Sequence, residues 1–170
     1  MIFFKASFRA GAWVFFSLFD EKGRLLHLSF GKEPAPRLLK RFKRFFPGAC
    51  LREDLPAFHI QRLQEILEAY FSRRLKELSF PCLLWGSPFE KRVWEAVSDI
   101  PYGEVRTYRW VAERIGNPQA VRAVGRALAS NPLPIFIPCH RVVACQSLGG
   151  FSQGLEIKKT LLRLEGAFRQ

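Results

Sequence analysis

The sequence has 170 residues and a formal net charge of +12, from 27 Lys and Arg against 15 Asp and Glu. Its 48% hydrophobic content is enough to fill the core of one domain or of two small ones. Seventeen Phe exclude a disordered basic tail, because such tails lack the apolar surface that offsets the entropy of ordering. Four scattered Cys without a Cys-x-x-Cys pair exclude a disulfide-stapled scaffold.

Residues 10–19 form an apolar run that follows Lys5 and Arg9 and weakly imitates a signal peptide. A charged cluster at 20–22 follows in place of a small-residue cleavage site. No apolar run approaches the ~18 to 20 residues that a membrane-spanning helix needs. We therefore expect a soluble, cytoplasmic protein without a membrane partner, in a compartment where thiols stay reduced.

The excess of positive charge is spread over both halves of the chain rather than confined to a tail. Such a basic globular protein suggests a polyanionic partner, most often nucleic acid. Surface charge that serves only solubility is the alternative.

Residues 1–80 predict a domain of mixed α and β structure. Three short runs of aromatic and aliphatic residues, interrupted by Gly11 and by a turn at 20–23, predict a small antiparallel meander. The runs span residues 2–9, 13–19 and 24–30.

Two helices are predicted in the remainder of this domain. Apolar residues recur at helical spacing over 37–46, where Pro47-Gly48 ends the pattern, and again over 56–78. The shorter helix carries five basic residues: Arg37, Lys40, Arg41, Lys43 and Arg44. These residues form either an ordinary solvated face or a DNA-contacting surface.

Residues 81–86 are predicted to be a linker, and residues 87–170 a mostly helical domain. Ser87-Pro88-Phe89-Glu90 is a strong helix start, with Ser as N-cap, Pro at the first helical position and Glu reaching back at the third. We expect this helix to run to about Ser98, before a turn at 101–103.

Two short helices are predicted next. Thr107 can cap the first, which Gly116 ends, and Asn117-Pro118 repeats the cap-then-Pro signal and opens a second helix over 119–129. Two helices joined by such a tight turn predict a helix-turn-helix unit.

The second of these helices has two different faces. Three apolar residues share the face that would pack inward: Val121, Val124 and Leu128. The remaining face carries Arg122, Ala123, Arg126, Ala127 and Ser130. Small residues let a backbone approach a surface closely, and guanidinium groups beside them can neutralise phosphates or enter a groove. An ordinary Ala-rich helix packed by small residues is the alternative.

Residues 131–143 form the most unusual stretch, because three prolines stiffen an apolar segment around Cys139. We expect Cys139 on a rigid, nearly buried turn. A buried thiol is normally inert, since a low dielectric disfavours the thiolate. It becomes a nucleophile when a base or a positive charge is held against it, and His140 and Arg141 follow directly. A structural core cysteine is the alternative.

This segment resembles the O6-alkylguanine-DNA alkyltransferase family. The matching motifs are Gly116-Asn117-Pro118, Arg122-Ala123-Val124-Gly125, Asn131-Pro132, Pro138-Cys139-His140-Arg141-Val142-Val143 and Gly149-Gly150-Phe151-Ser152. The resemblance covers about residues 85–167, whereas residues 1–80 match only the general shape of the family's variable N-terminal domain. It implies an α/β N-terminal domain followed by a mostly helical C-terminal domain with a winged-helix-like helix-turn-helix unit.

The resemblance implies direct-reversal DNA repair. Such a protein flips an O6-alkylated guanine out of duplex DNA and moves the alkyl group irreversibly onto Cys139, once per molecule, with O4-alkylthymine as a further candidate substrate. A damaged base pairs poorly, so its extrusion costs less than that of a sound base. The expected partner is double-stranded DNA containing O6-alkylguanine, met in the cytoplasm at the nucleoid. The protein is expected to be a monomer without a cofactor.

The resemblance also assigns roles at the site. Cys139 would be the nucleophile, His140 a base that acts through water, and Glu165 the acid that orients His140. Asn131 would hold the turn before the reactive loop, and Tyr108 would help to rotate the nucleotide and hydrogen-bond the leaving base. The residues expected to bind DNA are Tyr108, Arg122, Ala123, Arg126, Ser130, Arg141 and Ser152, with Arg122 filling the space that the flipped base leaves.

The sequence departs from the family pattern at two positions of the pocket segment. Phe151 stands where Tyr is common and Gln153 where Gly is common, and both are expected to wall the alkyl side of the site. Some members hold a structural zinc in the N-terminal domain. The Cys and His residues of this chain do not fall at those positions, so we expect no metal site.

Two other functions compete with this interpretation. A non-enzymatic lesion-binding protein, or a regulator built on the same helix-turn-helix, is the first. Lesion-binding relatives of this kind usually carry Trp in place of the cysteine, so Cys139 argues against them. A cysteine hydrolase is the second, but His27 and His59 lie on an apparent strand and helix with no supporting motif.

Overall fold

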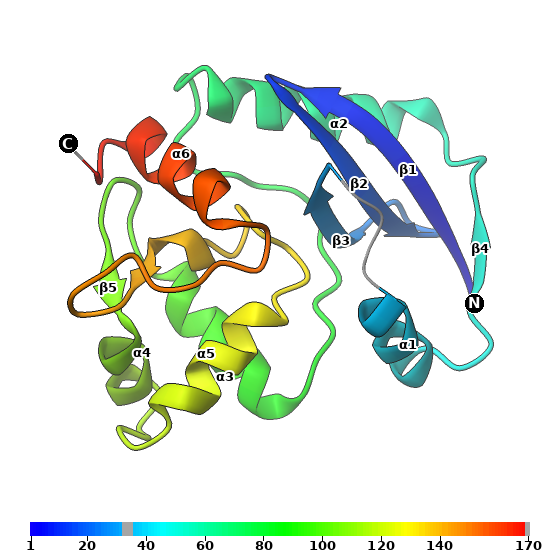
Figure 1. Cartoon of the computed structure of the whole chain (residues 1–170). Coiled ribbons are helices and arrows are strands. Elements are labelled where there is room, and N and C mark those ends of the chain that lie inside the picture. The colour runs from blue at the N-terminus through cyan, green and yellow to red at the C-terminus, as the bar shows by residue number, and fades with distance from the viewer. Residues whose placement is uncertain (32–35, 169–170) are drawn as a thin grey trace. The chain divides into compact units, whose positions relative to one another are not determined.

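The computed structural model describes residues 1–31 and 36–168 (Figure 1). The predicted mixture of α and β structure is confirmed, with six α-helices and two sheets among the described residues. The chain divides into two compact units, Met1–Trp85 and Gly86–Gln170. No helix in the described ranges is long and apolar enough to cross a membrane.

The first unit is built on a four-stranded sheet. In the order in which they lie side by side, its strands are β3 (Leu25–Phe30), β2 (Trp13–Asp20), β1 (Ile2–Ala10) and β4 (Cys50–Arg52). The predicted antiparallel meander is confirmed by β1, β2 and β3. Strand β4 was not predicted; it pairs in parallel with β1 and has only three residues, all exposed. An edge strand this short has no alternation of apolar and polar residues to reveal it.

Two helices cover opposite faces of this sheet, α1 (Pro36–Phe45) and α2 (Ala57–Phe71). On β2, Phe16 packs in a cluster that includes Phe42 of α1, whereas Phe15 stacks on Phe71 of α2 with ring centroids 5.9 Å apart. Successive side chains of a strand point to opposite faces. Six of the eight residues of β2 are therefore buried, and the strand shows no polar face.

The long second helix of this unit ends seven residues earlier than predicted. It was expected to reach residue 78 but stops at Phe71, and Arg73 adopts a left-handed backbone with φ of +59°. The amide of Arg73 donates to the carbonyl of Tyr70 and that of Arg74 to the carbonyl of Ala69, each at 2.9 Å, which satisfies two of the last helical acceptors. The apolar pattern continues beyond the helix because Leu75 and Leu78 remain half-buried in an irregular segment.

The segment 81–86 is not the linker that the sequence suggested. The amide of Leu25 donates to the carbonyl of Pro81 at 2.8 Å, and that of Leu83 to the carbonyl of Leu25 at 2.9 Å. The indole of Trp85 donates to the carbonyl of Leu26 at 2.8 Å. The segment satisfies backbone groups at the edge of the sheet and adds an aromatic ring to the core, so it belongs to the first unit up to Trp85.

The second unit is mostly helical. Its elements are α3 (Pro88–Ser98), β5 (Arg106–Thr107), α4 (Tyr108–Arg114), α5 (Val121–Ala129), the short 3-10 helix η1 (Cys139–Arg141), β6 (Val142–Val143) and α6 (Leu155–Glu165). The predicted start of α3 is confirmed, because Ser87 and Glu90 form a reciprocal capping box. Strands β5 and β6 pair in parallel and bring the segment after η1 beside the start of α4.

The predicted pair of short helices is present, with one change at the turn. Thr107 caps α4 by accepting from the amide of Trp110 at 3.1 Å, and Gly116 follows it with φ of +72°. The next helix begins at Val121, two residues later than predicted, since Asn117 does not cap it. Instead the carbonyl of Asn117 accepts from the amide of Ala120 and closes a turn.

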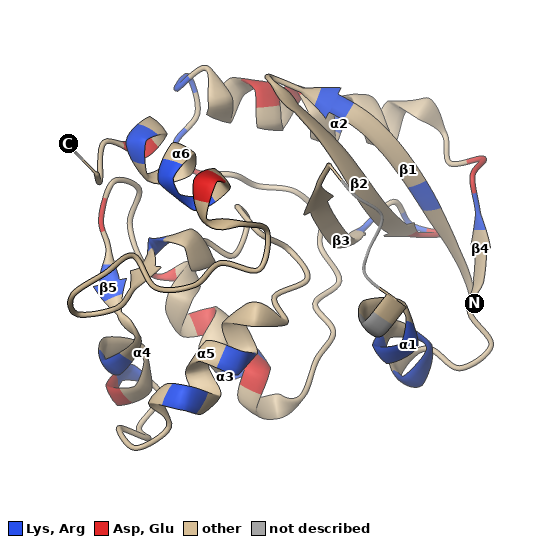
Figure 2. Cartoon of the chain, in the orientation of Figure 1, with Lys and Arg blue, Asp and Glu red and all other residues tan. Residues whose placement is uncertain are grey.

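Helix α5 packs against α3 through more of its surface than the sequence indicated. Val124 and Leu128 are buried as predicted, and Ala127 is also buried, although it was placed on the outward face. The carbonyl of Ala127 accepts from the buried indole of Trp94 at 2.8 Å. A small side chain at this position lets the Trp94 ring lie directly against α5. Figure 2 marks Lys and Arg residues along the ribbons of α4 and α5, and these residues are exposed.

Candidate active site around Cys139

Cys139 lies at the start of η1 and is 5% exposed, which confirms the expected nearly buried turn. The amide of Asn131 donates both to the carbonyl of Ile137, at 2.9 Å, and to the Sγ of Cys139, at 3.0 Å. Its side-chain oxygen accepts from the amide of Leu133 at 2.9 Å. Asn131 therefore joins both ends of the proline-rich segment and touches the thiol itself.

The segment between Asn131 and Cys139 contains a residue with a strained backbone. Ile135 has φ of +76°, in the left-handed region that a β-branched side chain rarely adopts. Such strain costs free energy and persists only where surrounding contacts hold it. The hydrogen bonds of Asn131 and the burial of Ile135 provide those contacts.

Burial raises the pKa of the Cys139 thiol to about 11. The hydrogen bond from Asn131 and the positive charge of Lys158 act in the opposite direction, but burial outweighs both. The thiol is therefore protonated at neutral pH, and it needs a proton acceptor to become a nucleophile.

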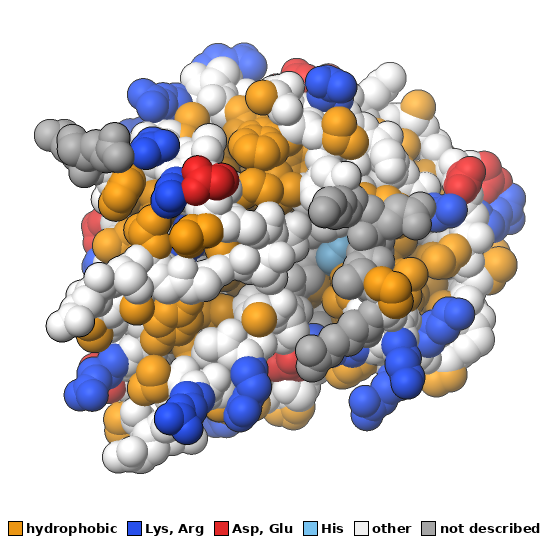
Figure 3. All heavy atoms as spheres, viewed as in Figure 1, with side chains coloured by type: hydrophobic (Ala, Val, Ile, Leu, Met, Phe, Trp, Pro, Cys, Tyr) orange, Lys and Arg blue, Asp and Glu red, His pale blue; other side chains and the backbone are white. Residues whose placement is uncertain are grey.

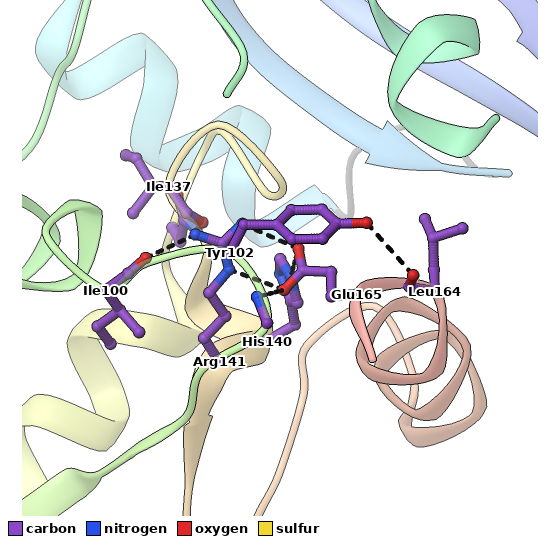
Figure 4. Close-up of polar contacts among 9 residues, drawn as sticks. Ile100, Tyr102, Ile137, His140, Arg141, Leu164 and Glu165 are labelled. Atoms are coloured by element: carbon purple, nitrogen blue, oxygen red, sulfur yellow. Dashed lines mark hydrogen bonds and ion pairs between the residues drawn. The ribbon is translucent and has the colours of Figure 1, made fainter. Parts of the chain in front are cut away.

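His140 lies beside this thiol in the chain and is fully buried. Its Nε2 lies 2.9 Å from the Oε1 of Glu165, at the end of α6 (Figure 4). Burial lowers the pKa of His140, so the ring is neutral at pH 7. Because a carboxylate only accepts hydrogen bonds, the neutral ring carries its proton on Nε2 and leaves a lone pair on Nδ1. That Nδ1 has no hydrogen-bond partner among the described protein atoms.

Arg141 corrects one prediction, because it was expected to bind DNA and instead turns inward. Its Nε and one terminal nitrogen donate to the two carboxylate oxygens of Glu165, each at 2.9 Å (Figure 4). Its other terminal nitrogen donates to the carbonyl of Ile100 at 2.6 Å. A carboxylate buried without a cation would be very costly, so Arg141 neutralises Glu165 rather than a phosphate.

A cavity of about 270 Å³ opens onto Cys139. Its lining consists of Tyr108, Gly125, Leu128, Ala129, Cys139, Gly150, Phe151 and Ser152. Phe151 thus lies where it was predicted, whereas Gln153 is outside this set. Gly149 allows the close approach of Tyr108 to the loop, because a Cβ there would lie 2.8 Å from the ring. The Tyr108 hydroxyl donates to the carbonyl of Gly150 at 3.4 Å, and burial raises its pKa.

The other residues expected to bind DNA lie in different surroundings. Arg122 and Arg126 are exposed on α5, and Ser152 is exposed at the mouth of the cavity. Ala123 is half-buried on α5. Ser130 is half-buried, and its hydroxyl donates to Oε1 of Glu90 at 2.6 Å, which connects the end of α5 to α3; its contact with DNA stays a prediction.

Lys158 was not predicted as a site residue; it is completely buried, and its Nζ donates to the carbonyl of Val142, directly after η1. A signal was present, since positions 158, 161, 162 and 165 share one face of α6 at helical spacing. Two of these four positions carry charged residues on a face that the other two bury. Within the described residues, no three His, Cys, Asp or Glu side chains gather in a way that could hold a metal ion.

Comparison with known proteins identifies the family. The family model for the 6-O-methylguanine DNA methyltransferase DNA-binding domain matches residues 88–167. The methylated-DNA–protein-cysteine methyltransferase of Methanosarcina barkeri is 50% identical over 147 residues, 86% of each chain. The enzyme of the same name from Methanosarcina acetivorans is 50% identical over 102 residues, a match that spans 59% of this chain and 65% of that protein.

A solved structure extends the likeness to both units. The crystal structure of Mycobacterium tuberculosis OGT in complex with DNA matches with a TM-score of 0.74 and 29% identity, over 98% of this chain and 93% of that one. The relatives and the buried cysteine site agree, and this chain belongs to the methylated-DNA–protein-cysteine methyltransferase family.

Proposed function

We propose that this protein repairs alkylated DNA by direct reversal, moving the alkyl group of an O6-alkylguanine in duplex DNA onto Cys139. The observation that carries this proposal is the cavity of about 270 Å³ that has the Cys139 thiol in its wall. His140 follows Cys139 directly in the chain, is neutral, and is hydrogen-bonded to the buried Glu165. O4-alkylthymine presents a similar alkylated oxygen and is the second substrate.

The chemistry follows from the protonation states of these groups. The Cys139 thiol gives its proton through one water molecule to Nδ1 of His140, and Glu165 stabilises the imidazolium that forms. The thiolate then attacks the alkyl carbon, a C–S bond forms, and the bond from that carbon to O6 breaks. The guanine leaves with the electron pair and takes a proton, for which the Tyr108 hydroxyl lies in the cavity wall.

The reaction stops after one turnover. A thioether on Cys139 is inert to water, and no group in the cavity lining is suited to hydrolyse it. One chain carries the thiol, the base and the helix proposed to face DNA, so the protein acts as a monomer.

Helices α4 and α5 form the DNA-binding helix-turn-helix, in a winged-helix-like arrangement with the loop that follows β6. Helix α5 carries the small residues Ala123 and Ala129 as well as its two exposed arginines, and small residues let a helix backbone approach a minor groove only ~6 Å wide. Gly125 and Ala129 of α5 line the cavity, so the base that enters it leaves the duplex beside this helix. Arg122 fills the vacated place in the stack, Arg126 contacts phosphate, and Ala123 and Ser152 approach the groove and the base.

A label-transfer experiment tests the proposal. Duplex DNA carrying O6-methylguanine with a labelled methyl group should deliver one label per protein molecule to the peptide that contains Cys139, and none to Cys139→Ser. Excess substrate should not raise the yield. Repeated turnover, or label on another residue, would overturn the assignment. A role limited to lesion binding is not favoured, since the thiol lies in the cavity wall and the relatives are named as methyltransferases.

A second measurement separates base extrusion from chemistry. Arg122→Ala should slow transfer from duplex DNA much more than transfer from the free base O6-benzylguanine, because a free base need not be flipped. Arg92→Ala, which removes an equal charge from an exposed position of α3, is the control and should affect neither substrate selectively. Equal losses on both substrates would remove Arg122 from the extrusion step.

A further inference from the structure

Helix α1 carries a cluster of positive charge that the site around Cys139 does not use. Lys40, Lys43 and Arg44 are exposed on this helix, and Arg41 beside them is half-buried. Together these four residues form the basic face of α1. Figure 2 marks Lys and Arg along this helix and no Asp or Glu. The side chain of Arg37, which belongs to the same run in the sequence, lies outside the described part of the structure.

The arrangement of these charges is unfavourable for a helix alone in water. Lys40 lies three positions before Lys43 and four before Arg44, spacings at which like charges on a helix repel one another. The C-terminal end of a helix attracts cations, which favours Lys43 and Arg44 in the last turn but does not extend to Lys40. Among the described residues, no carboxylate pairs with any of these three cations.

The other helices show that this charge pattern is not general. Four of the six α-helices of the described chain carry at least one acidic residue, namely α2, α3, α4 and α6. The remaining two, α1 and α5, have basic residues and no acidic one. Helix α5 is the helix proposed to face DNA. Helix α1 therefore has the charge composition of the DNA-facing helix and not that of the mixed, solvated helices.

Helix α2 gives the most direct comparison, because it covers the opposite face of the same sheet. Residues 57–77, which comprise α2 and the segment after it, contain four Lys and Arg and three Asp and Glu. Helix α1 contains five Lys and Arg and no acidic residue. Solubility does not require a surface of one sign, since mixed charges provide it as well. A surface of one sign attracts a polyanion.

The basic face of α1 is held in place by the aromatic core beneath it. The guanidinium carbon of Arg41 lies 5.6 Å from the ring centre of Phe45 and 5.3 Å from that of Trp85. Phe42, from the same helix, is 1% exposed and packs against Phe3 and Trp85. This packing fixes the buried side of α1 and leaves the cations on the outside. A phosphate backbone would therefore meet charges that are already in position, which lowers the entropy cost of binding.

We propose that the basic face of α1 is a second DNA-contacting surface, which binds the phosphate backbone of duplex DNA. The contact is independent of base sequence, because exposed Lys and Arg neutralise phosphates and release their counterions. The choice of duplex DNA as the polyanion rests on the proposed function, which brings such a duplex to α5. The basic face adds affinity for undamaged DNA and so helps to retain the protein on the duplex while it searches for a lesion.

A salt titration with the full-length protein tests this surface. The α1 variant combines Lys40→Gln, Lys43→Gln and Arg44→Gln, which remove three charges and leave the buried side of the helix unchanged. Binding to a fluorescently labelled, undamaged duplex is followed by anisotropy over a range of salt concentrations. Each cation that contacts a phosphate contributes about 0.9 to the slope of log K against log salt concentration. The slope of the α1 variant should therefore be shallower by about 2 to 3.

A matched control carries Arg62→Gln, Arg74→Gln and Lys76→Gln, which remove three exposed charges from α2 and the segment after it. The two variants have the same net charge, but the control should keep its slope within about one of that of the unsubstituted protein. Equal slopes in the two variants would overturn the proposal, as would a failure of the unsubstituted protein to bind the undamaged duplex. Circular dichroism checks folding, and if the triple α1 variant does not fold, each of its substitutions alone should lower the slope by about one.

Failure of this proposal and failure of the proposed function are distinguishable. Undamaged DNA carries no alkyl group, so the titration does not depend on transfer to Cys139. A protein that shows the expected slopes and transfers no alkyl group would contradict only the proposed function, whereas transfer with equal slopes would contradict only the role of α1. Vesicles containing phosphatidylglycerol test another polyanion. If the α1 substitutions weaken binding to these vesicles and leave the DNA slope unchanged, the surface serves a membrane and the proposal is wrong.

Discussion

The buried side chains of the two units differ in kind. In Met1–Trp85 the packing is largely aromatic, and the rings of Phe3, Phe42, Phe46 and Trp85 meet edge to face or tilted at centroid distances of 4.8 to 6.1 Å. In Gly86–Gln170 the interior contains charged side chains beside the reactive cysteine. These are Arg141, Lys158 and Glu165, together with the buried Asn131 and His140. Figure 3 shows Lys and Arg side chains scattered over the face of the molecule in view.

The aromatic side chains of the first unit serve packing, whereas the buried charges of the second unit serve function. Aromatic rings stabilise by the apolar area they remove from water, and many combinations of similar volume achieve this. A buried ionic network gains little net stability, because desolvation offsets most of the attraction. Its presence beside Cys139 therefore indicates a chemical role, and the pKa values of Cys139, His140 and Lys158 are all displaced by the same burial.

The largest expected effect comes from breaking this network at Glu165. Glu165→Gln leaves Arg141 buried without an anion, which should lower the free energy of unfolding of the second unit by about 3–5 kcal/mol. It should also slow alkyl transfer, since His140 loses the carboxylate that stabilises its imidazolium. Urea unfolding, read for each unit by limited proteolysis and mass spectrometry, measures the first effect. Glu156→Gln, at an exposed position of the same helix, should leave both quantities unchanged.

A matching disruption of the aromatic core should affect stability alone. Phe42→Ala removes a ring that is 1% exposed, and it should cost the first unit about 3–5 kcal/mol. Phe58→Ala, at a position 58% exposed, is the control and should cost little. The transfer rate per folded molecule should stay the same in both variants. A slower rate in Phe42→Ala would show that the aromatic core also supports the cysteine site.

Acidification should weaken the second unit through His140. Burial lowers the pKa of this side chain in the folded protein, whereas the unfolded chain protonates near its ordinary value of 6.5. Below pH 6.5 the unfolded chain therefore binds more protons than the folded protein. The free energy of unfolding then decreases by up to about 1.4 kcal/mol for each unit by which the pH is lowered. The urea midpoint at pH 7, 6 and 5 measures the slope, and His140→Phe should flatten it. His59→Phe, in the first unit, should leave the slope of the second unit as it was.

The smallest expected effect comes from the N-terminal cap of α3, which lies outside both interiors. Ser87→Ala removes the hydroxyl that accepts from the amide of Glu90 at 3.3 Å and so opens the capping box of α3. The cost should be about 1 kcal/mol, confined to the second unit. Ser98→Ala, near the other end of α3, changes a hydroxyl that caps no N-terminus and serves as the control. An unchanged urea midpoint in Ser87→Ala would mean that Glu90 alone holds this helix end.

Where residues close in sequence set the structure, the predictions hold. The caps at Ser87 and Thr107 use partners three residues away, and Asn131 reaches Cys139 across eight positions. The meander pairs strands that follow one another directly in the chain. One error was local, because Asn117 closes a turn with Ala120 in place of capping a helix. The larger errors concern segments whose apolar residues pack outside a regular helix or against a distant strand. The apolar spacing beyond Phe71 continued without a helix, and residues 81–85 became part of the first unit because the edge of β3 offered backbone partners.

The order Asn131, Pro138, Cys139, His140 is enough to predict the chemistry, because it restricts the backbone and places a base directly after a thiol. Tertiary structure decided which way the charged residues face. Arg141 meets Glu165 across 24 positions, Lys158 meets Val142 across 16, and Tyr108 meets Gly150 across 42. A charged side chain is equally compatible with solvent, phosphate or a buried partner until the fold supplies one. For Arg141 and Lys158 the partners lie in the interior. The sequence does not show these partners, because η1, α6 and residue 150 come together only in the folded chain.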